Sequence, residues 1–361
     1  MKIDELDTPA LIVDEEVMAK NLQRMSSYCR QHNLDLRPHT KTHKTPELAK
    51  EQLGSGACGI TVAKIGEAEV MSEEGLDDML LAYPVFGASK TARLNALLEK
   101  VRLSVALDSE DSATWVARAV DGKKVGILVE IDLGMRRCGL HPGPDAVRLA
   151  RFIESTPGLD FQGLLFYPGH IHPEYDEDTH KLQELDSELR KQLALFAKEK
   201  IPVPQVSGGS TPSAFHSHHI SGLTEIRPGT YIFNDRNTIE WGSCREENCA
   251  ASVLCTVVST SVPGQAIIDG GSKTFSSDPL RPRGNGGHGL VRNLPEVEFV
   301  AMNEEHGYLK LPPHLALESG QRVQIIPNHI CTTVNLHEVI FGYLGQEVVH
   351  SWPVRARGKI R

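Results

Sequence analysis

Short apolar runs alternate with longer stretches of helical periodicity from Thr8 to about Pro228. This alternation is typical of repeated βα units. The runs are almost continuously apolar, as expected of parallel strands buried on both faces, and eight such units predict a closed (β/α)8 barrel. A doubly wound parallel sheet is the alternative. The runs expected to form strands are 10–14, 34–39, 59–63, 78–83, 103–107, 125–132, 164–167 and 203–207.

The pattern changes after about Trp241. From there, β-rich segments follow one another, separated by glycine, proline and charged turns, with no long helical period between them. They predict a second, all-β domain. We therefore expect an α/β barrel domain over 8–240 and a β domain over 241–361 that also includes residues 1–7. The composition of residues 279–289, PLRPRGNGGHG, predicts a flexible loop.

Composition narrows the possible partners. The 361 residues carry a formal net charge of -9, which argues against nucleic acid or an anionic membrane as a general partner, because phosphate groups select a basic surface. The chain has no run of about 18 apolar residues and does not start with a secretory signal pattern, so we expect a cytoplasmic protein. Its 7 cysteines, an odd number in a long chain, are expected to be mostly buried thiols.

Residues 37–44, RPHTKTHK, concentrate three cations and two imidazoles behind a short apolar run. A lysine that is partly desolvated among other cations loses its proton more easily and becomes a nucleophile for carbonyl groups. Lys41 and Lys44 are both candidates for this role. The alternative is an ordinary solvated basic loop.

In a barrel of this kind, residues that follow the carboxyl ends of the strands gather on one face, where such enzymes have their active sites. Glycines and hydroxyls in SGGSTPS (207–213) would suit an anion such as phosphate, although an N-capped turn is the alternative. Arginines in DLGMRRCGL would suit a carboxylate or phenolate, or would pair with Asp132 for structure. The residues at these strand ends are Lys41, Asp132, Arg136, Arg137, Tyr167, His170, His172, Gly208, Gly209, Ser210 and Thr211.

The β domain contains one candidate metal site. His329 and Cys331, in PNHICTTVNLH, are two residues apart, so on an extended segment their side chains would point the same way. Imidazole with thiolate suits Zn²⁺, and two protein ligands would leave positions open for water or substrate. Taken alone, this spacing is common in proteins and carries little weight.

Seven motifs in order, LDTPALIVD, RPHTKTHK, VEIDLGMRRCG, SGGSTPS, EIRPGTYIFND, NEEHGYLKL and PNHICTTVNLH, resemble the D-threonine aldolase and metal-dependent D-serine dehydratase family over nearly the whole chain. The resemblance implies a fold-type III pyridoxal-phosphate enzyme with an alanine-racemase-like barrel and a C-terminal β domain. It also implies a homodimer whose active site lies at the subunit interface.

The resemblance assigns roles to individual residues. Lys41 matches the lysine that holds the cofactor as a Schiff base, which leaves Lys44 without a role. Arg137 matches an arginine near the cofactor ring or the substrate carboxylate, and His329 and Cys331 match the family's metal ligands. The positions that match contacts around the cofactor, mainly its phosphate, are Tyr167, Gly208, Gly209, Ser210, Thr211, Gly229 and Tyr231.

At two places this chain differs from the D-threonine aldolases of the family, and both differences bear on the reaction. The aldolases have His-x-Asp at the metal, whereas this chain has the His-x-Cys of the dehydratases, which favours dehydration. The segment YPGHIHP lacks the aldolase-like histidine directly after Tyr167, so whether His170 or His172 acts as a base stays open.

The expected function is that of a lyase on D-3-hydroxy amino acids that depends on pyridoxal 5'-phosphate and a divalent metal, with zinc first and manganese or magnesium as alternatives. D-serine dehydratase-like elimination of water would give an oxo acid and ammonia. The main alternative is retro-aldol cleavage to glycine and an aldehyde. Weaker alternatives are a D-3-hydroxyaspartate dehydratase, an amino-acid racemase and a pyridoxal-phosphate-binding protein without catalytic activity.

Overall fold

The structure is a computed structural model that describes residues 1–174, 176–280 and 286–361. Residues 281–285 of the loop predicted at 279–289 therefore lie outside the described residues. Among the helices of the described ranges, none has the length and apolar content that a membrane crossing requires. The chain forms two compact units. The barrel unit comprises Met25–Lys41, Pro46–Gly229 and Gly358–Arg361, and the β unit comprises Met1–Arg24, Thr42–Thr45 and Thr230–Arg357.

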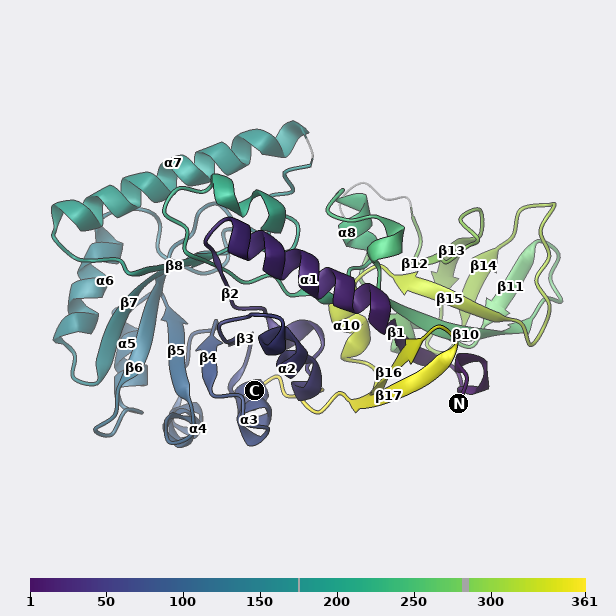
Figure 1. The fold of residues 1–361 in the computed structure, drawn as a ribbon, viewed down its shortest axis with the longest axis horizontal. Coiled ribbons are helices and arrows are strands. Elements are labelled where there is room, and N and C mark those ends of the chain that lie inside the picture. Colours follow the sequence, from purple (N-terminus) through teal and green to yellow (C-terminus); the bar gives the residue numbers. More distant parts are fainter. Residues whose placement is uncertain (175, 281–285) are drawn as a thin grey trace. The chain divides into compact units, whose positions relative to one another are not determined.

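The barrel unit is built on parallel strands in the order β2-β9-β8-β7-β6-β5-β4-β3 (Figure 1). A parallel bridge between His39, just after β2, and Thr61 in β3 joins the two outer strands, so the sheet closes on itself. The predicted fold class, an α/β barrel with a C-terminal β domain, is confirmed. The strands are β2 (Asp35–Leu36), β3 (Ile60–Val62), β4 (Asp78–Leu81), β5 (Arg102–Leu107), β6 (Val125–Glu130), β7 (Leu159–Leu165), β8 (Gln205–Gly208) and β9 (Glu225–Ile226).

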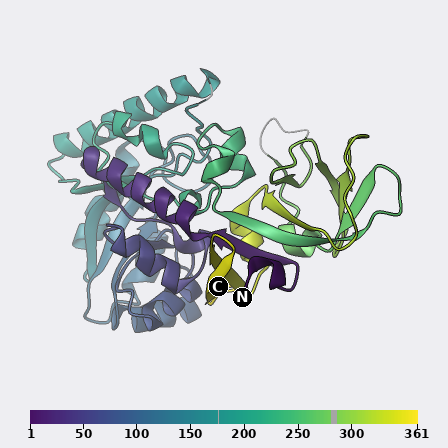
Figure 2. The same ribbon diagram turned by 45° about the vertical axis from the view of Figure 1, so that its right-hand side comes forward.

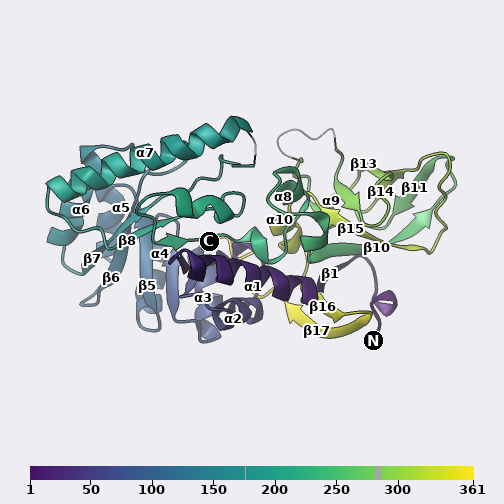
Figure 3. The same cartoon turned by 45° about the horizontal axis from the view of Figure 1, so that its top comes forward.

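Helices connect these strands and lie around the outside of the barrel (Figures 1 and 3). Local sequence explains where they begin: the Ser109 side chain accepts a hydrogen bond from the Ser112 backbone N–H at the start of α5, and Pro144 occupies the first turn of α6. These helices are α2 (Pro46–Gly54), α3 (Ile65–Glu73), α4 (Ala88–Leu98), α5 (Glu110–Ala117), α6 (Pro144–Ser155) and α7 (Asp176–Lys198), with the 3-10 turns η2 (Thr40–Thr42) and η3 (Ala214–His219). A further helix, α1 (Glu15–Gln31), begins in the β unit and ends in the barrel unit.

One predicted barrel strand is wrong. The apolar run at Ala10–Asp14 forms β1, which pairs antiparallel with β10 and parallel with β16 in the β unit. The missing barrel strand is β9, Glu225–Ile226, which the sequence analysis did not identify. A continuous apolar run indicates burial on both faces but not the sheet to which it belongs, and a two-residue strand is too short to show a period.

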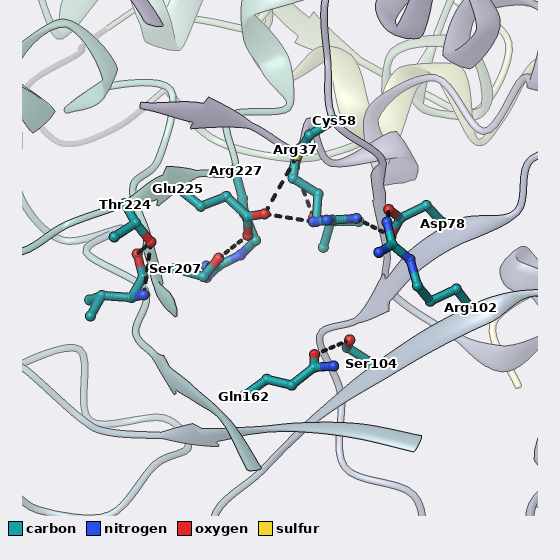
Figure 4. Close-up of polar contacts among 12 residues, drawn as sticks. Arg37, Cys58, Asp78, Arg102, Ser104, Gln162, Ser207, Thr224, Glu225 and Arg227 are labelled. Carbon is teal, nitrogen blue, oxygen red and sulfur yellow. Dashed lines mark hydrogen bonds and ion pairs between the residues drawn. The ribbon is translucent and has the colours of Figure 1, made fainter. Parts of the chain in front are cut away.

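A polar network links three strands of the barrel (Figure 4). Arg37 Nε donates to Glu225 Oε2 over 2.7 Å, and Arg37 Nη1 donates to Asp78 Oδ1 over 2.7 Å. Glu225 Oε1 accepts from Ser207 Oγ at 2.5 Å, and Ser207 Oγ accepts from Arg227 Nη1 at 2.5 Å. The network fixes Arg227 after β9, because its guanidinium donates to Ser207 Oγ, which in turn donates to Glu225.

The β unit contains a second, mostly antiparallel sheet in the order β11-β14-β13-β12-β15-β10-β1-β16-β17. An additional pairing of β11 with β10 closes the strands from β10 to β15 into a ring. Figure 2 shows the purple β1 beside the yellow C-terminal strands, in agreement with its pairing with β16. The further strands are β10 (Ala251–Ser259), β11 (Gln265–Ile268), β12 (Gly289–Val291), β13 (Glu298–Met302), β14 (Gly307–Lys310), β15 (Arg322–Pro327), β16 (Val339–Leu344) and β17 (Glu347–Pro353).

Alternation along the strands explains the packing of the β unit. In β15 the residues Val323 and Ile325 are buried whereas Arg322 and Gln324 are partly exposed, as expected of a strand with one face on a core. The rings of Phe275 and Phe299 meet edge to face at 5.2 Å between centroids. Short helical segments complete the unit: η1 (Ile3–Glu5), η4 (Thr230–Ile232), α8 (Arg236–Glu240), η5 (Glu246–Asn248), α9 (Ser272–Phe275) and α10 (Ile330–Val334).

Candidate active site

Lys41 lies in η2, directly after β2 and the bridge that closes the barrel. The turn is fixed by Thr40, whose hydroxyl lies 2.7 Å from Glu67 Oε1 and 3.0 Å from the Thr61 carbonyl oxygen. Lys41 Nζ is 5.6 Å from the centroid of the Tyr167 ring. Lys44 belongs to the β unit, where it is buried and its Nζ donates to the Ala356 carbonyl at 3.4 Å. The structure therefore places the two candidate lysines in different units, and Lys41 is the one that follows a barrel strand.

Positive charge gathers around Lys41. Arg137 Cζ lies 4.7 Å from the centroid of the same Tyr167 ring. Arg227 donates to the Phe166 carbonyl at 2.8 Å, and burial lowers its pKa to about 10. Burial, and then the charges of Lys41 and Arg227, hold the pKa of His39 well below its usual value, so this imidazole is neutral. A mouth with several fixed cations suits an anionic ligand.

The turn before Arg137 is shaped by Asp132. Its Oδ1 accepts hydrogen bonds from the backbone N–H groups of Gly134 and Arg136, each at 3.0 Å. Arg136 adopts a left-handed conformation with φ 55°. Asp132 thus stabilises the backbone of the turn by hydrogen bonds. Arg137, which follows this turn, contacts the Tyr167 ring.

The SGGSTPS segment lies at the carboxyl end of β8, as predicted, and it leads into the six-residue 3-10 turn η3. Gly208 ends the strand, and a Cβ placed there would lie 2.3 Å from the Phe166 ring. Gly209 has φ +82°, which favours glycine. Ser210 Oγ is 2.9 Å from Ser213 Oγ.

Thr211 gives the clearest test of whether this turn fits a phosphate. Its hydroxyl oxygen is buried and has no hydrogen-bond partner within the described part of the chain. Buried hydroxyls are rarely left unpaired, so such an atom calls for a ligand or a water molecule. A phosphate oxygen could accept its proton, and the cations at the barrel mouth would offset the phosphate charge. The residues present therefore fit the cofactor that the family resemblance implies.

Replacement of Thr211 by valine tests this fit, because Thr211→Val keeps the shape of the side chain but removes its hydroxyl. We expect the dissociation constant for pyridoxal phosphate to rise about 10-fold or more, since a hydrogen bond to a charged group contributes about 1.5–3 kcal/mol. Titration of the apoprotein, followed by cofactor absorbance, measures this constant. Thr211→Ser retains the hydroxyl and should bind nearly as the unmodified protein does. Equal affinities for Thr211→Val and Thr211→Ser would contradict the assignment.

His329 and Cys331, hereafter the metal pair, lie in the β unit. His329 is the residue before α10 and Cys331 is inside it, so the pair is not on an extended segment and the geometric reason for the prediction is wrong. Their side chains nevertheless hydrogen-bond to each other. His329 Nδ1 lies 2.7 Å from Asp278 Oδ2, and Cys331 Sγ lies 3.3 Å from Thr42 Oγ1.

The charges of the metal pair reinforce each other. Burial favours the neutral imidazole, but the thiolate of Cys331 and the carboxylates of Asp235 and Asp278 raise the pKa of His329 to about 10. Burial also opposes the Cys331 thiolate, yet His329 and Thr42 hold the pKa of Cys331 below its usual value. A metal ion would take the place of the shared proton. Groups of three or more His, Cys, Asp or Glu side chains that could hold a metal do not occur among the described residues.

The structure distributes the predicted site residues over both units. Lys41, Arg137 and Tyr167 are joined by the ring contacts described above. Tyr231 is buried in η4 of the β unit. The chain passes between the two units at Arg24–Met25, Lys41–Thr42, Thr45–Pro46, Gly229–Thr230 and Arg357–Gly358. The predicted residues of the barrel unit are Lys41, Arg137, Tyr167, Gly208, Gly209, Ser210, Thr211 and Gly229, and those of the β unit are Tyr231, His329 and Cys331.

Sequence reasoning missed two residues that the geometry makes prominent. Arg227 directly follows the apolar Ile226 at a strand end, a signal of the kind that was used for Arg137. Asp278 lies in an irregular segment with no periodicity, and only the fold brings it to His329. Of the open base candidates, His172 is engaged by Asp178, whose Oδ2 accepts from its backbone N–H at 2.9 Å.

Comparisons with known proteins agree with this architecture. The alanine racemase N-terminal domain matches residues 13–237, and the serine dehydratase domain matches residues 250–343. A D-threonine aldolase from Arthrobacter sp. is 31% identical over 98% of this chain and 93% of its own length. A D-threo-3-hydroxyaspartate dehydratase from Delftia sp. (strain HT23) is 32% identical over 91% of this chain and 92% of its own length.

Solved structures extend the comparison. The crystal structure of D-threonine aldolase from Filomicrobium marinum has a TM-score of 0.92 at 30% identity and covers 100% of this chain and 98% of its own. A cysteine-to-alanine mutant of the D-threo-3-hydroxyaspartate dehydratase, solved in the metal-free form, has a TM-score of 0.87 at 29% identity and covers 98% of both chains. The chain therefore belongs to the family of pyridoxal-phosphate-dependent lyases that includes D-threonine aldolases, D-serine dehydratases and 3-hydroxyaspartate dehydratases.

Proposed function

We propose that this chain is a lyase that depends on pyridoxal phosphate and a divalent metal, and that it eliminates water from a D-3-hydroxy amino acid to give an oxo acid and ammonia. D-serine is the first substrate in this proposal, and zinc is the first metal. The proposal includes the homodimer that the family resemblance implies.

The metal pair carries the proposal. An imidazole and a thiolate in mutual contact form a ligand pair suited to Zn²⁺, and Asp278 at His329 Nδ1 is the outer carboxylate that metal-binding histidines commonly have. The metal-free dehydratase relative is a cysteine mutant, and another structure of that enzyme replaces a histidine numbered two positions earlier. The same spacing separates His329 from Cys331. This agreement supports dehydration as the reaction.

The residues at the barrel mouth would bind the cofactor and the substrate, and one of them would accept a proton. Pyridoxal phosphate, when bound, makes the substrate Cα–H acidic because its ring withdraws electrons. Ser210 and Thr211 would bind the phosphate, and Arg137 would bind the substrate carboxylate as a planar donor. Lys41 would hold the cofactor covalently and, once freed by the substrate, accept the Cα proton with its amine.

The metal pair would act at the other end of the substrate. His329 and Cys331 would hold a Zn²⁺ ion, which would supply Lewis acidity to stabilise a hydroxyl as a leaving group. Asp278 would keep the His329 ring in the orientation and tautomer that leave the second nitrogen free for the metal. Thr42, at 3.3 Å from Cys331 Sγ, would stabilise the thiolate.

Retro-aldol cleavage is the second candidate. The D-threonine aldolase of Filomicrobium marinum covers the whole chain at a TM-score of 0.92, which supports an aldolase as a direct competitor. Both reactions need a cofactor lysine and a metal near the 3-hydroxyl group. They differ in the bond that breaks, which is Cβ–O in dehydration and Cα–Cβ in the aldol reaction.

Product analysis tests the proposal. The holoenzyme with added zinc is incubated separately with D-serine, D-threonine and D-threo-3-hydroxyaspartate. We expect pyruvate and ammonia in equal amounts from D-serine. Glycine with acetaldehyde from D-threonine, or glycine with glyoxylate from the hydroxyaspartate, as the main products would transfer the assignment to an aldolase. A yellow protein that forms no product from any of the three would instead support a binding protein without catalytic activity.

A further inference from the structure

Cys244 and Cys249 of the β unit lie side by side, and the proposed reaction uses neither of them. Both are free thiols, and their side chains are hydrogen-bonded to each other with Cys249 as the donor. We propose that this pair is a reversible oxidation site, at which a hydroperoxide converts the two thiols into a Cys244–Cys249 disulfide.

The two cysteines differ in access and in freedom to move. Cys249 is fully buried, and the carbonyl of the preceding Asn248 accepts hydrogen bonds from Asn21 Nδ2 at 2.8 Å and Asn234 Nδ2 at 3.0 Å. Cys244 is only partly buried and lies in the turn after α8. An oxidant in solution therefore reaches Cys244 first, and Cys249 is a fixed partner behind it. The 3-10 turn η5 joins them, so closure requires only a local movement of the Cys244 turn.

The thiol chemistry favours this order of events. The hydrogen bond from Cys249 holds the pKa of Cys244 below its usual value, although burial opposes this shift. The same hydrogen bond, together with burial, raises the pKa of Cys249 well above its usual value. Cys244 therefore forms the attacking thiolate more readily than Cys249, which is the thiol that resolves.

Oxidation proceeds in two balanced steps. The Cys244 thiolate attacks one oxygen of the hydroperoxide, so the O–O bond breaks, a sulfenic acid forms on Cys244 and the leaving oxygen departs as water or an alcohol after taking up a proton. Cys249 sulfur then attacks the Cys244 sulfur, so the S–O bond breaks and the hydroxyl leaves with the Cys249 proton as a second water. The two thiols lose two electrons, and the peroxide bond accepts them.

A short path of hydrogen bonds connects the cysteines to the metal pair. Cys244 Sγ lies 3.4 Å from Thr238 Oγ1, and Thr238 is the partner of Asp235 in the capping box of α8. Asp235 Oδ2 accepts from the Ile330 backbone N–H at 3.1 Å, and Ile330 is the residue between the two members of the metal pair. A disulfide sulfur has no proton to donate to Thr238, so oxidation removes the first contact of this path. We expect oxidation to weaken metal binding, a consequence that rests on the proposed function of the metal pair.

The experiment treats the full-length holoprotein, with zinc present to protect Cys331, with hydrogen peroxide. Intact mass and peptide mapping follow the cysteines, and metal affinity is measured before and after oxidation. Cys244→Ser and Cys249→Ser remove the two partners in turn. Cys58→Ser is the matched control, because Cys58 is an exposed cysteine of the barrel unit.

We expect the unmodified protein and Cys58→Ser to lose two hydrogen atoms in mass, with the linkage mapped to Cys244 and Cys249 and reversed by dithiothreitol. Cys249→Ser should stop at a sulfenic acid on Cys244 that dimedone traps, and Cys244→Ser should give neither product. Unchanged thiols, or a linkage that involves another cysteine, would overturn the inference. The oxidised protein should bind zinc about 10-fold more weakly. A disulfide that forms in a protein with no zinc affinity in either state would leave the oxidation site intact and contradict the proposed metal site.

Discussion

Lys41→Ala is expected to abolish turnover of every D-3-hydroxy amino acid, with a loss of about 10⁴-fold or more, because a single amine would hold the cofactor and accept the Cα proton. The variant should also lose the visible absorbance of the covalently bound cofactor. Borohydride reduction of the unmodified protein, followed by peptide mass mapping, identifies the lysine that carries pyridoxal phosphate.

Lys44→Met provides the matched control for this experiment. Lys44 is buried and donates to Ala356, so methionine keeps most of its packing while removing the amine. This variant should retain the covalent cofactor and a substantial part of the activity. A cofactor mapped to Lys44, or a Lys41→Ala protein that still reduces with borohydride, would refute the assignment of Lys41.

Removal of the metal is expected to reduce D-serine dehydration by about 10²-fold or more, because a Lewis acid contributes several kcal/mol to the departure of the hydroxyl. Chelation should cause this loss, and added zinc or manganese should reverse it. His329→Ala and Cys331→Ala should lose activity without recovery, while the cofactor absorbance stays unchanged. Asp278→Asn keeps the size of the residue that faces His329 and should weaken metal affinity about 10-fold.

Cys255→Ala is the control for the cysteine variant, since Cys255 is a fully buried cysteine of β10 in the same unit. It should retain metal and activity, with some loss of stability from the space left in the core. Metal analysis of each preparation belongs to the test. Undiminished turnover in a preparation that contains no metal would rule out the proposed role of the metal pair.

Sequence patterns predicted the architecture well but assigned one strand to the wrong sheet. Ala10–Asp14 reads as a buried strand, and it is one, but its neighbours are fixed by pairing with Leu254 and Ile340, far along the chain. Short-range periodicity contains no information about such partners. Conversely, Glu225 and Ile226 form a barrel strand through tertiary pairing alone.

The candidate site shows the same division between local and long-range information. In the sequence, only the family resemblance distinguished Lys41 from Lys44 as the cofactor lysine. In the structure, the two lysines belong to different units. His329 and Cys331 were selected together for a geometric reason that the helical turn at α10 contradicts. Asp278 could not be predicted, because its closeness to His329 arises from the fold and not from spacing in the sequence.

The position of β1 also has a consequence for synthesis on the ribosome. All strands of the barrel sheet, β2 to β9, have been made once residue 226 is complete, so this sheet can close early. In contrast β1, which precedes all the barrel strands in the chain, pairs with residues 251–254 and 340–343, which are made much later. Until then both of its edges are open to pairing with other chains. Nascent chains that stall between these two stages therefore expose a strand that favours aggregation.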